Sequence, residues 1–85
     1  MRWDLIISSP ATRDLRHVPR SDLLRVRAAF HSMKDEPYSG DTKVLRGDGG
    51  VFRRRVGVWR ITFELRREQH LIVVLRVKRR SSKTY

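Results

Sequence analysis

Polar and apolar positions alternate most regularly between residues 58 and 65. A period of two places large apolar side chains on one side of this segment and Arg60 on the other. This is the pattern of a β-strand with one buried face. The apolar side consists of Trp59, Ile61, Phe63 and Leu65.

A second strand-like run, residues 51–55, precedes this segment and ends at Val56-Gly57. The two runs predict an antiparallel hairpin with a tight turn. In the first run, Arg53 and Arg55 share a face. The hairpin is therefore expected to gather several guanidinium groups, Arg60 included, on one concave surface.

Two helices are predicted before this hairpin. Arg2–Ile7 reads as a first strand, and Ser9 is placed to cap a helix from Pro10 to His17. A second helix is expected from Ser21 to Lys34, because apolar residues recur there at intervals of three and four. This stripe consists of Leu23, Val26, Ala29, Phe30 and Met33.

The end of the chain predicts a buried strand. Leu71–Val77 is almost continuously apolar and rich in β-branched residues, which favours a central strand. Pro37–Asp41 reads as a polar loop, and no strand is assigned to Lys43–Gly50. The predicted order is βααβββ, in one domain spanning residues 1–85. The expected fold is α+β, with a two-helix hairpin on a twisted, mostly antiparallel, four-stranded sheet.

Charge is distributed unevenly along the chain. Residues 1–42 carry seven Arg and Lys against six Asp and Glu, whereas residues 43–85 carry thirteen against three. Sixteen of the twenty basic residues are arginine, the side chain whose fork fits phosphate. Because the excess lies on strands, it favours nucleic acid over an anionic membrane surface. The simpler interpretation is a solvated basic face that only keeps the protein in solution. Evenly spread lysines would fit that interpretation better than this arginine-rich half of the chain does.

The composition argues against several other classes of protein. The chain has no cysteine, which excludes disulfides and thiolate metal sites and fits a cytoplasmic protein. No signal peptide or membrane span is expected, because the longest apolar run is only Leu71–Leu75. No phosphate-binding glycine loop or metal-ligand spacing occurs, so no cofactor and no metal are expected.

Three segments together resemble a known family. They are Lys43–Gly47, Val51–Glu64 with its Arg-Val-Gly-Val-Trp-Arg core, and Leu71–Val77 followed by a basic tail that ends in Tyr85. Their sequence and order resemble the RelE/ParE superfamily of bacterial type II toxins. The resemblance implies one of two activities: RelE-type members cut mRNA in the ribosomal A site, and ParE-type members inhibit DNA gyrase.

The RelE-type residues have counterparts in this chain, which favours the ribonuclease. The resemblance implies a catalytic set on the second and third strands of the family sheet and in the tail: Arg53, Arg55, Arg60, Arg80 (or its neighbour Arg79) and Tyr85. RNA contacts are expected from Lys43, Arg46, Arg54, Lys78 and Arg79. Clustered cations stabilise the phosphorane-like state formed when a ribose 2′-hydroxyl attacks the next phosphate. Tyr85 is expected to stack on a base.

One departure from the RelE pattern concerns the general base. Arginine stands at positions 53 and 55, where RelE has lysine, and guanidinium stays protonated at physiological pH. Glu64 shares the strand parity of Arg60 and is a possible base, although an ion pair with an arginine is the more ordinary role. His17, His31 and His70 read as surface or packing residues.

The resemblance also implies partners. An acidic antitoxin is expected to cover the arginines or displace Tyr85, and mRNA on the ribosome is the expected substrate. Two alternatives remain open from the sequence. One is a gyrase inhibitor without nuclease activity, and the other is a non-catalytic module that binds nucleic acid.

Overall fold

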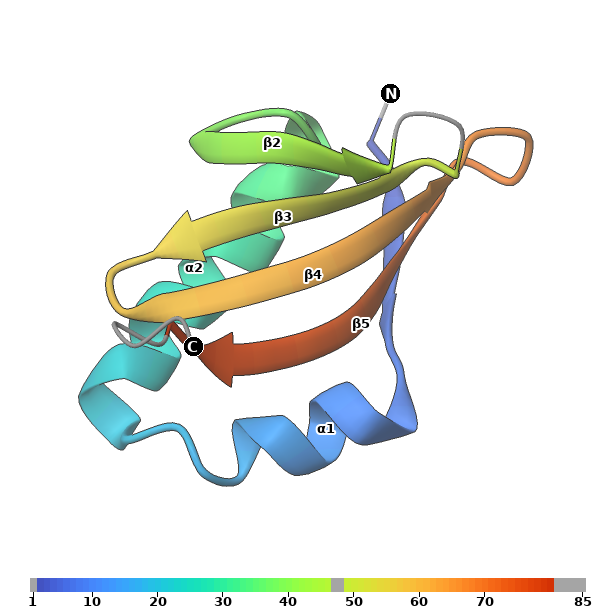
Figure 1. Ribbon diagram of the computed structural model, residues 1–85. Helices are drawn as coiled ribbons and strands as arrows, with labels where there is room; N and C mark the ends of the chain where they lie inside the picture. Colours follow the sequence, from blue (N-terminus) through green and yellow to red (C-terminus); the bar gives the residue numbers. More distant parts are fainter. Residues whose placement is uncertain (1, 47–48, 81–85) are drawn as a thin grey trace.

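The fold consists of two helices and a five-stranded sheet in a computed structural model that describes residues 2–46 and 49–80 (Figure 1). In chain order the elements are β1 (Asp4–Ile7), α1 (Ser9–Leu15), α2 (Arg20–Asp35), β2 (Asp41–Arg46), β3 (Val51–Val56), β4 (Trp59–Arg66) and β5 (Leu71–Arg79). The strand order is β1-β5-β4-β3-β2. Only the β1–β5 pair is parallel. The α+β class and the mostly antiparallel sheet are therefore confirmed.

The sheet has five strands, so the prediction of four is wrong. The additional strand is β2, which pairs with β3 at the edge of the sheet. Its sequence lacks an apolar run, and Val44 and Leu45 are 54% and 46% exposed. A bulge between Val44 and Arg46 further breaks its alternation. An edge strand with so little burial is held by backbone pairing, which the hydrophobic pattern does not show.

Both helices begin one residue earlier than predicted. Ser8, rather than Ser9, is the N-cap of α1, and its Oγ accepts the N–H of Ala11 at 3.3 Å. The same hydroxyl donates to the carbonyl of Leu75 at 3.1 Å, so the cap also ties α1 to β5. Helix α2 begins at Arg20, directly after Pro19.

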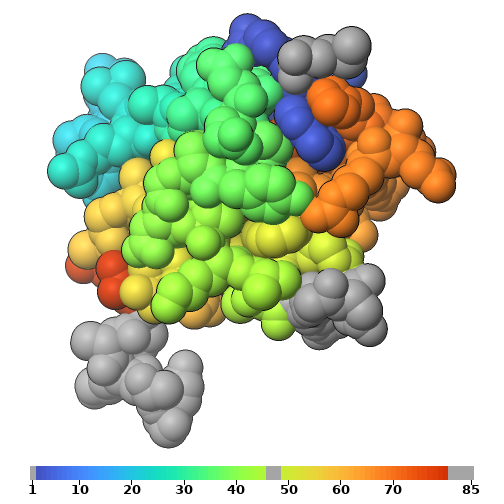
Figure 2. Space-filling model, turned by 90° about the horizontal axis from the view of Figure 1, so that it is seen from above, coloured from blue at the N-terminus to red at the C-terminus, as the bar shows by residue number. Residues whose placement is uncertain are grey.

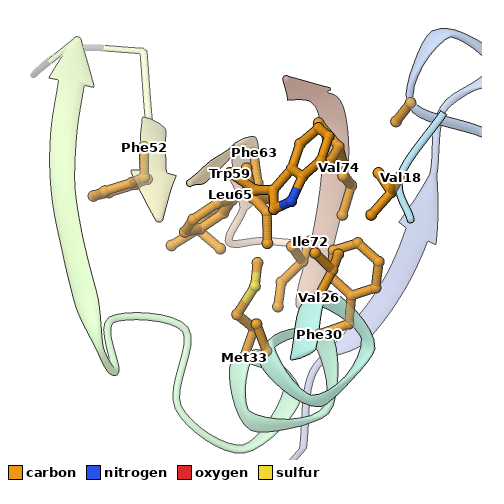
Figure 3. Packing of buried hydrophobic residues seen from close by; sticks show 14 residues of the cluster. Val18, Val26, Phe30, Met33, Phe52, Trp59, Phe63, Leu65, Ile72 and Val74 are labelled. Carbon is orange, nitrogen blue, oxygen red and sulfur yellow. The ribbon is translucent and has the colours of Figure 1, made fainter. Parts of the chain in front are cut away.

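The core lies between α2 and the face of the sheet that the β4 pattern predicted (Figure 3). Val26, Phe30 and Met33 of α2 are buried, as predicted from the helical stripe. Trp59 is 7% exposed and Phe63 is fully buried. The indole Nε1 of Trp59 donates to Asp22 Oδ2 at 2.9 Å, so this buried polar group has a partner on α2.

Strand β5 is an interior strand between β1 and β4, and Ile72, Val73 and Val74 are all buried, as its apolar run predicts. β1 pairs with the first part of its edge, and α1 lies along the remainder (Figure 1). There Asp14 Oδ2 accepts the backbone N–H of Val77 at 2.9 Å. Neither helix among the described residues is long and apolar enough to span a membrane.

The hairpin between β3 and β4 turns at Gly57 and Val58. Val56 pairs with Trp59, and Gly57 has φ +60. A positive φ at the first central residue and not at the second is the pattern of a type II′ turn, which matches the twist of the paired strands. The short turn therefore fixes the register of β3 against β4, and this register places the arginines.

Candidate nucleic-acid interface

Figure 1 shows the face of the sheet that is turned away from α2. Strand pairing aligns two adjacent rows of residues on this face, across β2, β3, β4 and β5. In antiparallel pairs, directly opposite Cβ atoms lie roughly 4.5–5.5 Å apart. Strand register aligns the first row as Asp41, Arg55, Arg60 and Lys78. It aligns the second row, two residues further along, as Lys43, Arg53, Thr62 and Arg76.

The first row holds three cations on neighbouring strands. Arg55, Arg60 and Lys78 occupy consecutive strands, and none of the three forms an ion pair within the described residues. Arg60 and Lys78 are exposed, whereas Arg55 is half-buried and its Nε has no hydrogen-bond acceptor. Like charges at opposite positions repel. An anion bound over this row would relieve that repulsion.

Arg53 belongs to the second row, but it already forms an ion pair with Asp41. Its side chain is 4% exposed, and Nη1 donates to the backbone carbonyl of Asp41 at 3.0 Å and to Asp41 Oδ1 at 3.1 Å. The hydrogen bond from Arg53 holds the pKa of the Asp41 carboxyl below its usual range. Arg53 therefore anchors the start of β2, and this contact was not foreseen because Asp41 was assigned to a loop.

Arg54 lies on the opposite face of β3, toward α2. Its Nη1 donates to Ser32 Oγ at 3.0 Å and to Ser39 Oγ at 3.1 Å. Burial without a carboxylate partner lowers the pKa of Arg54. Arg54 therefore lies on the other side of the sheet from Arg53 and Arg55, because neighbouring residues of a strand point to opposite faces. Its predicted contact with RNA stays a prediction.

Arg80 reaches the end of the first row. Its backbone N–H donates to the carbonyl of Val58, and its Nη1 donates to the carbonyl of Gly57 at 3.0 Å. The guanidinium is thus held on the β3–β4 turn. Arg79 pairs opposite Trp59, with the strand parity of the core face, and lines a pocket of about 320 Å³ that His17 also lines. Between the two alternatives, Arg80 has the strand parity of Arg60 and Lys78.

The structure describes three further predicted site residues to different extents. Lys43 is exposed in the second row and has no ion pair in the described part of the chain. β2 ends at Arg46, whose side chain is not described. Tyr85 lies outside the described residues.

Two side chains that could in principle accept a proton, Glu64 and His70, lie outside the first row. Glu64 Oε1 pairs with Arg66 Nε at 3.3 Å. Glu64 also lies four residues from Arg60, about 13 Å along a strand. His70 stacks on Trp3 with ring centroids 4.1 Å apart, where the N-terminal segment meets the β4–β5 turn (Figure 2). Among the cations of the first row, Lys78 supplies the amine, whereas Arg55 and Arg60 carry guanidinium groups.

Two pairs of neighbouring residues at the site were not predicted from the sequence. The pairing of Lys78 with Arg60 needs the β4–β5 register, which shifts between Thr62 and Phe63. The Arg76 guanidinium, from the open face, is bound by both carboxylate oxygens of Asp14 at 2.8 and 3.0 Å. These bonds hold the pKa of Asp14 below its usual range. No local sequence signal connects residues so far apart in the chain.

Comparison with known proteins agrees with this architecture. The family described as ParE toxin of type II toxin-antitoxin system, parDE, matches residues 5–84. The RelE1 protein of Methanocaldococcus jannaschii is 25% identical over 83 residues, 94% of this chain and 92% of that protein. A chain of the toxin-antitoxin complex RelBE2 from Mycobacterium tuberculosis is 30% identical, with a TM-score of 0.82, over 94% of this chain and 100% of its own length. A chain of the archaeal RelE-RelB complex from Pyrococcus horikoshii is 22% identical, with a TM-score of 0.88, over 98% of this chain and 100% of its own length.

The fold and the open face together define a small α+β protein with a polycationic sheet surface. The chain belongs to the RelE/ParE superfamily and is a toxin of a type II toxin–antitoxin system. The resemblance found in the sequence is therefore confirmed. The matching residues 5–84 include every strand of the open face except the first residue of β1.

Proposed function

We propose that this toxin is a metal-independent endoribonuclease that cleaves mRNA on the ribosome, in the cytoplasm, and so stops translation. The observation that supports this most directly is the first row, where Arg55, Arg60 and Lys78 stand side by side and form no ion pair within the described residues. A row of fixed cations on a rigid sheet suits one scissile phosphodiester. An inert solvated surface would have no reason to concentrate like charges in this way.

The proposed reaction is an internal transesterification. The ribose 2′-oxygen attacks the adjacent phosphorus, the bond from phosphorus to the 5′-oxygen breaks, and a 2′,3′-cyclic phosphate and a 5′-hydroxyl result. The 2′-hydroxyl loses one proton to a base, and the leaving 5′-oxygen gains one. Arg60, flanked by Arg55 and Lys78, faces the non-bridging oxygens, whose negative charge grows in the transition state.

Lys78 takes the role of the proton acceptor in this proposal. Guanidinium groups are poor proton acceptors, and Arg53 is in addition buried against Asp41. Lys78 is exposed directly opposite Arg60, so its amine is on the same face as the phosphate bound there. In its neutral form this amine accepts the proton of the 2′-hydroxyl.

The remaining predicted residues position the RNA. In this proposal Arg80, held at the β3–β4 turn, and Lys43, exposed in the second row, contact flanking phosphates. Arg79 contacts RNA next to the pocket that it lines. Arg46 and Tyr85 keep their proposed roles as a phosphate contact and a base-stacking residue.

An acidic antitoxin is the proposed protein partner. The two solved relatives described above are both toxin–antitoxin complexes, RelBE2 and RelE-RelB. A net charge of +11 favours association with an acidic segment, which would neutralise the toxin by covering the first row. Toxin and antitoxin would then form a hetero-oligomer.

The decisive experiment is primer extension on mRNA from cells that express the toxin, with an Arg60→Ala variant expressed at the same level as the control. We expect cleavage within translated mRNA for the wild type and uncut mRNA for the variant. Uncut mRNA with both proteins, despite growth arrest by the wild type, would contradict the proposal.

Gyrase inhibition is the second candidate, because the matching family is described by ParE. It predicts that cleaved DNA–gyrase complexes accumulate while translated mRNA stays intact. Binding without cleavage of either nucleic acid would instead indicate the non-catalytic module, whose affinity would fall steeply with salt.

A further inference from the structure

A pocket of about 480 Å³ opens between α2, the start of β2 and the end of β3. Figure 2 views the molecule from this side, where α2 and the connection from α2 to β2 lie next to β2. Its charged lining consists of Arg25 from α2, Arg54 and Arg55 from β3, and Asp41 from β2. Guanidinium groups thus outnumber the single carboxylate by three to one.

The carboxylate forms its ion pair with an arginine outside this lining. Asp41 is bound by Arg53, on the other face. Arg54 donates only to the neutral hydroxyls of Ser32 and Ser39, and its Nε is buried without an acceptor. Arg25 has no ion pair within the described residues. Desolvation of an unpaired guanidinium costs free energy, which an anion in the pocket would offset.

Gly40 holds Arg54 in this position. Its φ is +67, and a Cβ built there would lie 2.6 Å from Arg54 Nε and 2.8 Å from Arg54 Nη2. Only glycine allows the backbone to pass so closely over the guanidinium. The Nη1 side of Arg54 is fixed by the serines, so the orientation of the group is determined from both sides.

The pocket is continuous with the open face through Arg55. The edge strand β2 begins at Asp41, which pairs opposite Arg55. The part of β3 that follows Arg55 therefore has no β2 residue beside it, and here the two faces of the sheet meet at its edge. Arg55 therefore lines the pocket and also stands next to Arg60 in the first row. A strand of RNA lying over Arg60 can continue past Arg55 into the pocket.

We propose that this pocket binds a backbone phosphate of the RNA, flanking the phosphate that Arg60 holds. This inference rests on the proposed function, because it takes the ligand to be the substrate strand. Arg55 is shared by the two phosphate sites, and Arg25 is an exposed contact from α2. The site would lengthen the RNA footprint without adding any sequence readout.

The test measures the salt dependence of RNA binding to the folded toxin. The probe is a short 2′-O-methyl oligoribonucleotide, which cannot be cleaved. Each lost phosphate contact lowers the slope of log K against log salt by about 0.7 for a single strand. We expect this change for Arg25→Ala. Arg27→Ala is the matched control, because Arg27 is exposed on the same helix and lines a different pocket.

A second variant tests the pocket without removing a charge. Gly40→Ala displaces the Arg54 guanidinium, and we expect weaker RNA binding once circular dichroism has shown that the variant is folded. Equal salt slopes for the wild type, Arg25→Ala and Arg27→Ala would overturn the proposal. So would an Arg25→Ala variant that binds RNA normally but loses affinity for oligoglutamate, because the pocket would then be a carboxylate site for a protein partner.

The cleavage assay separates this inference from the proposed function. If the wild type leaves mRNA intact while Arg25→Ala still lowers the salt slope, the phosphate pocket is supported and the nuclease is not. If the wild type cleaves mRNA while the slopes are equal, the nuclease stands and the pocket is refuted.

Discussion

Arg60 on β4 lies directly opposite Lys78 on β5, and neither forms an ion pair within the described residues. Two cations in this relationship destabilise the free protein through repulsion. Their retention side by side on an exposed face is best explained by an anionic ligand, and the predictions below separate their roles.

Replacement of Arg60 by alanine should abolish cleavage without unfolding the protein. Loss of one group that stabilises developing charge typically reduces the rate by about 10²- to 10³-fold. The free energy of unfolding should stay the same or rise, because a repulsive neighbour is removed. Single-turnover cleavage and urea unfolding of the same preparation measure both. A variant that retains its full cleavage rate would show that Arg60 is not the phosphate contact.

Replacement of Lys78 by arginine should preserve RNA binding and remove the proton acceptor. We expect the rate to fall about 10²- to 10⁴-fold. Lys43→Arg, the same change in the second row, is the control that should keep the rate.

The Asp14 carboxylate should make stability depend on acidic pH. Its pKa is lowered in the folded protein, chiefly by the hydrogen bond from Arg76. Its contribution is therefore complete above its unfolded pKa of about 3.9 and is lost as the pH falls through the lower folded pKa. In urea unfolding at pH 7 and pH 3, Asp14→Asn should lose less stability on acidification than the wild type.

The same residue should stabilise the edge of β5 at neutral pH. Asp14 is 11% exposed on its side chain and accepts from both Arg76 and the N–H of Val77. Asp14→Ala leaves that N–H without its acceptor, and we expect a loss of about 1–3 kcal/mol in the free energy of unfolding. Asp14→Asn, which keeps one side-chain oxygen, should lose less. Equal losses in the two variants would show that the backbone contact contributes nothing.

Substitution of Gly40 should destabilise the fold for two separate reasons. Alanine there must adopt φ +67 and must also displace Arg54, so we expect Gly40→Ala to destabilise the fold by about 1–2 kcal/mol. Asparagine tolerates the backbone conformation but carries the same Cβ. If the clash with Arg54 dominates, Gly40→Asn should be as unstable as Gly40→Ala, as thermal unfolding can determine. A fully stable Gly40→Asn variant would assign the whole effect to the backbone.

The elements with strong local patterns were predicted correctly, and those without them were not. The alternation that buries Trp59 and Phe63 and the helical stripe through Met33 both reflect one element packing against one core. Edge strand β2 has no such pattern, because three of its six residues are charged and its apolar side chains are half exposed.

The candidate site divides in the same way. Strand parity within β3 already separates Arg54 from Arg53 and Arg55, since adjacent side chains point to opposite faces. Parity does not show that Arg53 would be 4% exposed against Asp41, because that burial depends on the start of β2. It also does not show which residue faces Arg60 across the sheet.

The sequence by itself determined the α+β class, the buried face of β4, the basic half of the chain and its membership of the toxin superfamily. These properties follow from short-range periodicity and from composition. Only the tertiary structure decided that Lys78 lies opposite Arg60, that Asp41 neutralises Arg53, and that Arg54 faces a pocket under α2. Those contacts depend on strand register and on where an edge strand begins, which are set by packing between segments distant in the chain.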